Sequence, residues 1–125
     1  MPKTSTKTAT IHADFGIGEE WMEDLDGYTV DIVKLREASD LGPLLKGLPD
    51  DLCQCPHWGY LLKGSMTVTY ADREEVYEAG DAFYMSPGHS PRNAPDTEFV
   101  IFSPKEEFAI LQAHFEKAMA AQQQG

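Results

Sequence analysis

The sequence predicts an all-β domain, an antiparallel sandwich or barrel, that ends in one C-terminal α-helix. Short runs of alternating apolar and polar residues, separated by Gly, Pro and Asp, recur between Tyr28 and Phe102, and this pattern is typical of antiparallel β structure. After Ser103 the spacing of the apolar residues becomes helical. The 125 residues suit one domain and leave little room for a second. Six Phe, five Tyr and two Trp supply the bulk of a core.

The chain is expected to begin with a flexible arm, residues 1–10, because this stretch is polar and rich in Thr. Residues 11–125 then form the single predicted domain, which includes a C-terminal helix over 104–121. The first segment of this domain carries large apolar side chains with no obvious place in a minimal barrel, so we expect it to pack on the barrel or on a second subunit. These side chains are Ile11, Phe15, Ile17 and Trp21.

The first clear strand covers residues 28–35. Alternation puts Tyr28, Val30 and Ile32 on one face and Thr29 and Asp31 on the other. Two Gly and two Pro interrupt residues 40–51, so this stretch is expected to be an irregular connection or a short turn of helix.

The centre of the sequence is dense in strand signals. The run Phe99–Phe102 consists of four apolar residues and is expected to be buried on both faces. Two segments are expected to be turns, the pair Gly80-Asp81 and the proline-rich stretch 86–91. The other predicted strands are 58–62, 66–70, one that begins at 76–77, and 82–85.

The C-terminal segment has the signature of a helix start. Ser103 can cap a helix, Pro104 suits its first position, and Glu106 completes a capping box. Apolar residues then recur at helical spacing and predict one apolar stripe. These residues are Phe108, Leu111, Phe115 and Met119.

The charge of the chain limits its partners. The formal net charge is −11, from 21 acidic and 10 basic residues, so phosphate backbones and anionic membranes would repel the chain. A small neutral or cationic ligand would be compatible with this negative charge. The sequence has no run of about 18 apolar residues and no apolar stretch of a secretory signal. Two Cys, at 53 and 55, make a poor disulfide framework. A cytoplasmic location is the simplest expectation.

Two stretches hold nearly all the unusual residues, Asp51–Gly64 and Gly80–Asn93. They resemble the two motifs of the cupin family. The first family motif has two His, a Glu and a Gly, and the second has the form Gly-Asp, Pro-Gly, His. Gly64 matches the Gly that closes the first motif, and Gly80-Asp81 and Pro87-Gly88 match the turns of the second. The resemblance covers roughly residues 28–103 and implies a jelly-roll β-barrel with its functional site inside.

The resemblance does not extend to the usual metal ligands. Counted back from Gly64, the position of the family's Glu is occupied by His57, and the two His positions by Cys53 and Asp51. The last His position falls on Pro91. An intact centre of three His and one Glu is therefore rejected for this chain.

A rebuilt metal centre is one alternative. Alternation in a regular strand would put Cys53, Cys55 and His57 on one face, and His89 is expected to point inward as well. Cys and neutral His are good ligands for Zn²⁺ or Fe. On a straight strand Cys53 and His57 would be about 13 Å apart, too far to share an ion. Cys55 with His57 and His89 is therefore the more feasible set, although Pro56 could also turn Cys55 away.

A metal-free pocket is the other alternative, and the sequence slightly favours it. Buried cysteines commonly act as small apolar side chains. His57 and His89 could bind a polar ligand, or move a proton on it as catalytic residues. Trp58, Phe83 and Met85 are the candidate ligand-binding walls.

The function classes that remain open are an enzyme and a binding module. We expect a cupin that binds or acts on a small metabolite through His57 and His89. The enzyme would be an isomerase, lyase or oxygenase, with no cofactor or with a single divalent metal (Zn or Fe). The alternative is a non-catalytic ligand-binding or dimerisation module. A homodimer is expected, and neither nucleic acid nor a membrane is expected as a partner.

Overall fold

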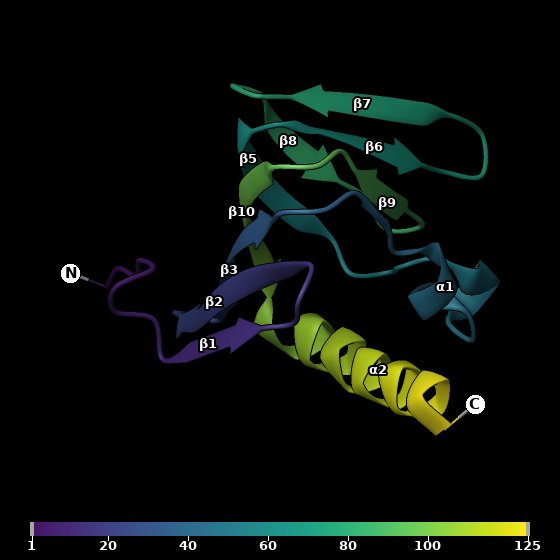
Figure 1. Cartoon of the computed structure of the whole chain (residues 1–125), viewed down its shortest axis with the longest axis horizontal. Helices are drawn as coiled ribbons and strands as arrows, with labels where there is room; N and C mark the ends of the chain where they lie inside the picture. The colour runs from purple at the N-terminus through teal and green to yellow at the C-terminus, as the bar shows by residue number, and fades with distance from the viewer. Residues whose placement is uncertain (1, 125) are drawn as a thin grey trace.

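Two antiparallel sheets and a long C-terminal helix make up the computed structural model of the chain, which describes residues 2–124, and the side chains of residues 2–121 (Figure 1). The larger sheet has six strands in the order β1-β2-β3-β10-β5-β8. Their bounds are β1 Ile11–Asp14, β2 Gly18–Leu25, β3 Tyr28–Leu35, β10 Thr97–Pro104, β5 His57–Lys63 and β8 Ala82–Met85. The predicted antiparallel β class with one terminal helix is confirmed.

The smaller sheet has four strands in the order β4-β9-β6-β7. Its strands are β4 Ser39–Asp40, β9 Ser90–Asn93, β6 Ser65–Thr69 and β7 Glu74–Glu78. A short helix, α1 (Gly42–Leu45), and a single 3₁₀ turn (Pro49–Asp51) occupy the stretch that Gly and Pro interrupt, as predicted.

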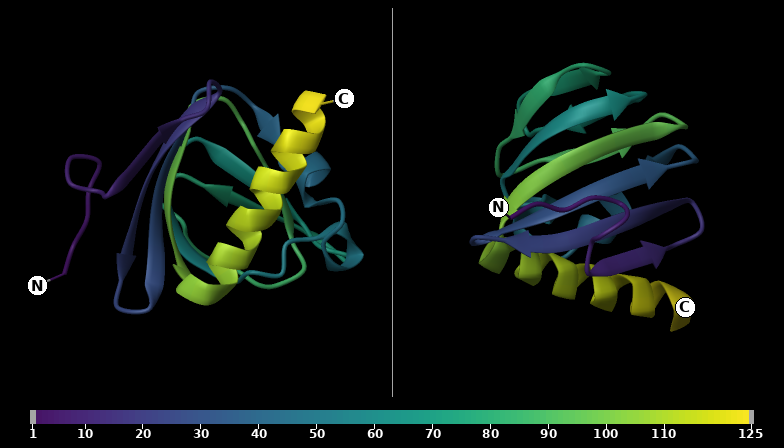
Figure 2. Two further views of the ribbon diagram at one scale, coloured as in Figure 1. Left: turned by 90° about the horizontal axis from the view of Figure 1, so that it is seen from below. Right: turned by 90° about the vertical axis from the view of Figure 1, so that its left-hand side faces the viewer.

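Helix α2 (Lys105–Gln124) lies across the open side of the curved sheets (Figure 2). It follows β10 directly and contacts α1, β10 and β3. Its apolar stripe faces the space between the sheets, where Phe108 and Leu111 are buried. No helix within residues 2–124 is long and apolar enough to cross a membrane.

The structure decides which face of β3 is the inner one, and it contradicts the prediction for β10. On β3 the inner face carries Asp31 and Val33, which line a cavity, whereas Tyr28 is exposed on the outer face. On β10 Ile101 is buried but Phe102 is 43% exposed, so the prediction that this run is buried on both faces is wrong. The reason is that no layer of the described chain covers the outer face of β10 at that point.

The N-terminal segment forms an edge of the large sheet. Strand β1 pairs with β2, and Trp21 is buried beneath a stacked His12 ring. Phe15 and Ile17, in the β1–β2 turn, line the cavity mouth. Thr10 is held by two hydrogen bonds to the Glu23 carboxylate. This segment therefore packs on its own barrel.

Candidate functional site in the barrel

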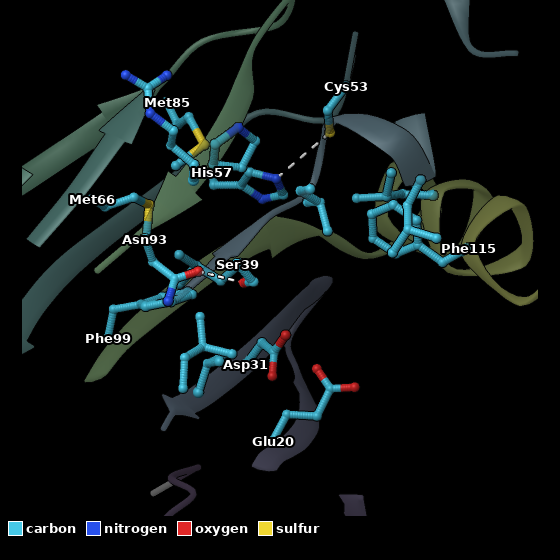
Figure 3. A pocket seen from close by; sticks show the side chains of 18 of the residues that line it. Glu20, Asp31, Ser39, Cys53, His57, Met66, Met85, Asn93, Phe99 and Phe115 are labelled. Carbon is cyan, nitrogen blue, oxygen red and sulfur yellow. Dashed lines mark hydrogen bonds between the residues drawn. The ribbon is translucent and has the colours of Figure 1, made fainter. Parts of the chain in front are cut away.

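A cavity of about 460 Å³ lies between the two sheets and α2 (Figure 3). Its wall is mostly apolar and is formed by strands of both sheets, the β1–β2 turn, α1 and α2. Val33, Met66, Met85, Ile101, Leu111 and Phe115 are typical wall residues. Volumes of roughly 300–1,000 Å³ with mostly apolar walls are usual for small-molecule sites.

Three potential ligand groups meet on one wall of this cavity. Sγ of Cys53 and one ring nitrogen each of His57 and His89 lie within 4.8 Å of one another, and all three residues are buried. Cys53 Sγ is 3.9 Å from His57 Nε2, and the two imidazole centroids are 5.1 Å apart. We call these three residues the Cys–His–His cluster.

The backbone brings Cys53 to His89. Cys53 N–H donates to the His89 carbonyl at 2.9 Å, and Gly88 N–H donates to the Cys53 carbonyl at 2.8 Å. Residues 54–56 are irregular and β5 begins only at His57. The expectation that Cys53 is too far from His57 is therefore wrong, because it assumed a straight strand between them.

Each histidine has its Nδ1 occupied. His89 Nδ1–H donates to the Ser86 carbonyl at 2.5 Å, since a carbonyl can only accept. His57 Nδ1 is hydrogen-bonded to Ser103 Oγ at 2.6 Å. These bonds leave Nε2 of both rings for a ligand, an arrangement common in histidines that bind metals.

The role of Ser103 differs from the prediction. Ser103 is fully buried on the inner face of β10, and its hydroxyl bonds His57. Helix α2 begins two residues later, at Lys105. The predicted capping box with Glu106 is therefore wrong, because the strand continues through Ser103 and turns its hydroxyl into the barrel.

Burial keeps the cluster uncharged when nothing is bound. Desolvation, with a smaller effect of His89, lowers the pKa of His57 to about 3. Desolvation also lowers the pKa of His89 and raises the pKa of the Cys53 thiol to about 11. Both imidazoles are therefore neutral near pH 7 and the thiol keeps its proton.

The donor set suits a borderline-soft divalent ion. One thiolate and two imidazoles are familiar Zn²⁺ ligands, and three protein ligands leave a position open for another group. Ligand atoms around tetrahedral Zn²⁺ lie roughly 3.3–3.8 Å apart, from bond lengths of about 2.0–2.3 Å. The widest pair here is 4.8 Å apart or less, so modest side-chain rotation would close the cluster. The residues present therefore fit a metal.

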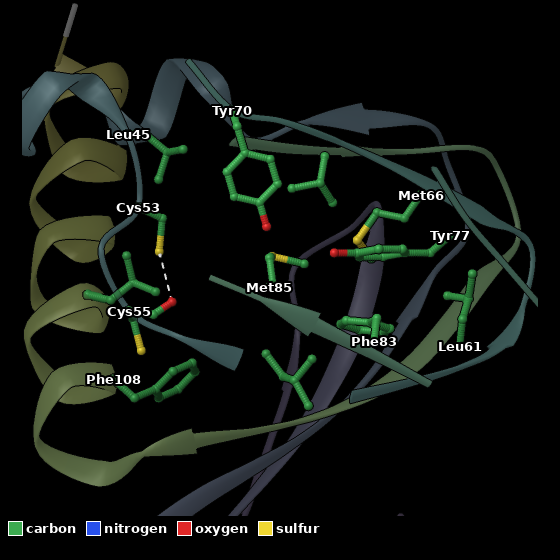
Figure 4. Close-up of a cluster of buried hydrophobic side chains, with 13 residues drawn as sticks. Leu45, Cys53, Cys55, Leu61, Met66, Tyr70, Tyr77, Phe83, Met85 and Phe108 are labelled. Atoms are coloured by element: carbon green, nitrogen blue, oxygen red, sulfur yellow. Dashed lines mark hydrogen bonds between the residues drawn. The ribbon is translucent and has the colours of Figure 1, made fainter. Parts of the chain in front are cut away.

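The remaining predicted positions lie elsewhere. Cys55 is buried, but its Sγ bonds the Pro56 carbonyl and faces α2 near Phe108 (Figure 4). Asp51 accepts a hydrogen bond from Gly47 N–H on an exposed turn. Pro91 lines the cavity but offers no ligand atom. Cys53, rather than Cys55, completes the set with the two histidines, because Pro56 ends the irregular stretch and redirects the Cys55 side chain.

The three predicted ligand-binding walls have different surroundings. Met85 lines the cavity. Phe83 is buried against Tyr77, with ring centroids 4.5 Å apart, and belongs to the core outside the cavity. Trp58 is 42% exposed on the outer face beside Tyr84. It does not line the cavity, because consecutive residues of β5 point to opposite faces and His57 takes the inner one.

Two acidic residues of the cavity were not predicted. Asp31 on β3 and Glu20 on β2 both line it, and Figure 3 shows their carboxyl groups turned toward each other. The alternation of β3 could have indicated that Asp31 is in the cavity, since Asp31 shares its face with Val33 and Leu35. It was not predicted because the opposite face of β3 is also apolar.

Comparison with solved structures identifies the fold. No protein-family profile and no curated protein matches the chain. Among solved structures, an RmlC-like cupin from Shewanella frigidimarina is 16% identical, with a TM-score of 0.55 over 81% of this chain and 88% of that one. KdgF from Halomonas sp. is 18% identical, with a TM-score of 0.52 over 75% of this chain and 87% of that one. An oxalate decarboxylase is 16% identical, with a TM-score of 0.57 over 76% of this chain but only 27% of its own.

Proposed function

The chain has the cupin fold, and we propose that it binds a small, largely apolar molecule inside the barrel, next to the Cys–His–His cluster. The observation that carries the proposal is the convergence of Cys53, His57 and His89 on a cavity of about 460 Å³. A polar centre on a mostly apolar wall is the usual design of a small-molecule site, because the wall supplies affinity and the polar groups orient the ligand.

The cluster also supports a metal at this centre, either Zn²⁺ or Fe²⁺. A bound divalent ion would supply a Lewis acid beside the cavity. Cys53 would lose its thiol proton on binding, since only the thiolate is a strong ligand. Ser103 and the Ser86 carbonyl would orient His57 and His89 through their Nδ1 atoms. Both contacts use Nδ1, so they would orient the two Nε2 atoms toward the ion.

A metal-free pocket is the second candidate. Burial keeps both imidazoles neutral and the thiol protonated, so the cluster places no net charge in the barrel when it holds no ion. In that form, His89 Nε2 would accept a hydrogen bond from a ligand, because its Nδ1–H donates to the Ser86 carbonyl. His57 Nε2 would accept or donate according to whether its Nδ1 donates to or accepts from Ser103 Oγ. The two candidates share the same residues and differ in metal content.

The experiment compares two neighbouring cysteines. The full chain is purified without an affinity tag, incubated with Zn²⁺ or, anaerobically, with Fe²⁺, desalted, and assayed for bound metal. We expect one equivalent in the wild type and in Cys55→Ala, and a large loss in Cys53→Ala and His57→Ala. Both cysteines are buried free thiols, so Cys55→Ala controls for the general effect of removing one.

The metal proposal has two contrary outcomes. Wild-type protein that retains no ion from either solution would leave the metal-free pocket as the function. Equal metal loss in Cys53→Ala and Cys55→Ala would show that the loss follows from removing either buried thiol, and would overturn the role of Cys53 as a ligand. Substitution with Co²⁺ adds a direct readout, since thiolate ligation gives a charge-transfer absorption that Cys53→Ala must abolish.

We also propose that two copies pair through the outer face of the large sheet. Large apolar side chains from four of its strands are each 42–55% exposed there: Tyr28, Trp58, Tyr60, Leu62, Tyr84 and Phe102. The five aromatic side chains alone expose roughly 300–550 Å², taking about 150–250 Å² for each whole side chain. A standard interface buries about 800 Å² per partner, and a self-complementary flat face suits a second copy.

A further inference from the structure

A pair of carboxyl groups lies on the inner wall of the cavity, outside the Cys–His–His cluster. Asp31 pairs in register with Met22 on one side and with Ile101 on the other, so apolar side chains flank it. Only 5% of Asp31 is exposed. Glu20 lies diagonally from Asp31 across β2 and β3, and both residues line the cavity.

Asp31 lacks a partner for one of its oxygens. Oδ1 is buried and accepts no hydrogen bond from the protein. Leaving a buried polar atom unpaired is costly, and such atoms in native proteins commonly mark a bound group or a functional site. Burial, reinforced by the charge of Glu20, raises the pKa of Asp31 well above its usual range. A buried, unpaired carboxyl oxygen beside a second carboxyl therefore marks this pair as a place for a hydrogen-bond donor.

The charges around the cavity favour a cationic group. The other acidic residues of the wall are Asp40 and Glu116, and within residues 2–124 Arg92 is the one Arg or Lys that lines it. Arg92 already binds Thr69 and Glu74. The Asp40 carboxylate accepts from Gly42 N–H. Asp40 and Glu116 are both exposed, so Asp31 and Glu20 are the acidic groups of the wall that are buried or half-buried inside the barrel.

The carboxyl pair lies within one small molecule of the cluster. Asp31 is in register with Ile101, so Ser103, two residues further along β10, is its diagonal neighbour on the same inner face. Diagonal neighbours in an antiparallel pair are about 7–8 Å apart. The Ser103 hydroxyl holds His57. A ligand of a few carbon atoms can therefore reach from the carboxyl pair to the cluster.

We propose that Asp31 and Glu20 bind the protonated amine of a small ligand whose apolar body fills the cavity beside the Cys–His–His cluster. This inference rests on the proposed small-molecule function and names the ligand class, an aliphatic or aromatic primary amine. An ammonium group donates up to three hydrogen bonds, which would satisfy Asp31 Oδ1 and the Glu20 carboxylate together. The apolar body contacts Phe99, Phe115 and the other wall side chains.

The test compares amines with matched alcohols and acids on the full chain at neutral pH. Binding of hexylamine, 1-hexanol and hexanoate, and of 2-phenylethylamine and 2-phenylethanol, is measured by calorimetry. We expect each amine to bind at least about tenfold more tightly than its alcohol, since a hydrogen bond between charged groups is roughly twice as strong as a neutral one. Hexanoate should bind more weakly than 1-hexanol.

The variants locate the preference. Asp31→Asn and Glu20→Gln should each bring the affinity for the amine down to that for the alcohol. Asp40→Asn, on the same wall but already bonded to Gly42, should leave the preference unchanged. Metal content is measured on every variant, and none of these three should alter it.

The outcomes distinguish failure of the amine site from failure of the proposed small-molecule function. Equal binding of amine and alcohol by the wild type, or an amine preference that survives Asp31→Asn, would overturn the amine site and leave the apolar binding function standing. If no probe of either series binds, the small-molecule function and the amine site both fall. Loss of metal without loss of the amine preference would concern the cluster alone.

Discussion

Replacing Ser103 by Ala tests how the cluster is held. Ser103 Oγ lies 2.6 Å from His57 Nδ1, and both residues are buried. The change removes one hydroxyl from the inner face of β10 and leaves His57 Nδ1 without a partner. The sequence pattern predicted that Ser103 caps α2. The same substitution therefore distinguishes a helix cap from a hydrogen-bond partner of His57.

The expected loss has two parts. A buried ring nitrogen left without its partner costs about 1–3 kcal/mol of unfolding free energy. For a chain of this length that corresponds to a fall in Tm of roughly 3–6 °C per kcal/mol. If His57 binds a metal, loss of its outer hydrogen-bond partner should also lower metal affinity about 10–100-fold. Loss of a helix cap would cost about 1 kcal/mol and leave metal affinity unchanged.

Urea unfolding gives the stability change, and competition with a Zn²⁺ chelator gives the affinity. Glu106→Ala is the matched control, because Glu106 is exposed and would be the other half of the capping box. We expect it to cost no more than about 0.5 kcal/mol, as surface substitutions commonly do, and to leave Zn²⁺ affinity unchanged. A wild-type Zn²⁺ affinity in Ser103→Ala, or equal destabilisation by the two variants, would refute the role of Ser103 as the partner of His57.

Four other substitutions test the acidic pair, two turn glycines and the outer face. A carboxyl whose folded-state pKa is raised binds more protons in the folded than in the unfolded chain, so Asp31 destabilises the fold increasingly as pH rises above its unfolded value of about 3.8. Asp31→Asn should therefore raise the free energy of unfolding at pH 7 by at least about 1 kcal/mol, since each unit by which folding raises a pKa costs about 1.4 kcal/mol. Thermal melts should show this gain in stability disappear near pH 4. A gain that does not change with pH would contradict the assignment. Gly64→Ala should cost about 2–4 kcal/mol in urea unfolding, because Gly64 has φ +82° and a Cβ there would lie 2.7 Å from Thr97 Cα. Gly80→Ala, with φ +96° and open space around it, should cost only about 1–2 kcal/mol, and equal losses would show that crowding by Thr97 is unimportant. Trp58→Glu should convert a dimer into a monomer in sedimentation experiments at micromolar concentration; a monomeric wild type would rule out pairing through that face.

Local patterns were sufficient to predict most of the strands and the C-terminal helix, but β1, β2, β4 and β9 were not predicted. Alternation over 66–70 and turn residues at Gly64 and Gly80-Asp81 predicted β6 and its neighbours, because these signals depend on the chain's own period and turn chemistry. The stripe through Phe108 and Leu111 predicted α2 for the same reason. The two motif stretches also identified His57 and His89 as residues of one site.

The errors concern residues whose surroundings come from distant parts of the chain. Cys53 joins the cluster because its backbone bonds His89, 36 positions later, and no local period encodes that pairing. Ser103 resembles a cap in sequence, yet the barrel draws it into β10, where His57 competes for its hydroxyl. Asp31 was assigned to a face without a direction, since alternation separates two faces but does not say which one is inside.

The sequence by itself determined the central strands, the C-terminal helix, the β class and the two stretches that form the site, since each of these follows from the local order of apolar, polar and turn residues. The tertiary structure alone decided which cysteine accompanies the histidines, where Ser103 points, and that Asp31 and Glu20 share the cavity. Those features depend on strand register and on a bend at residues 54–56, and both are set by packing of the two sheets and α2 over long separations in the chain.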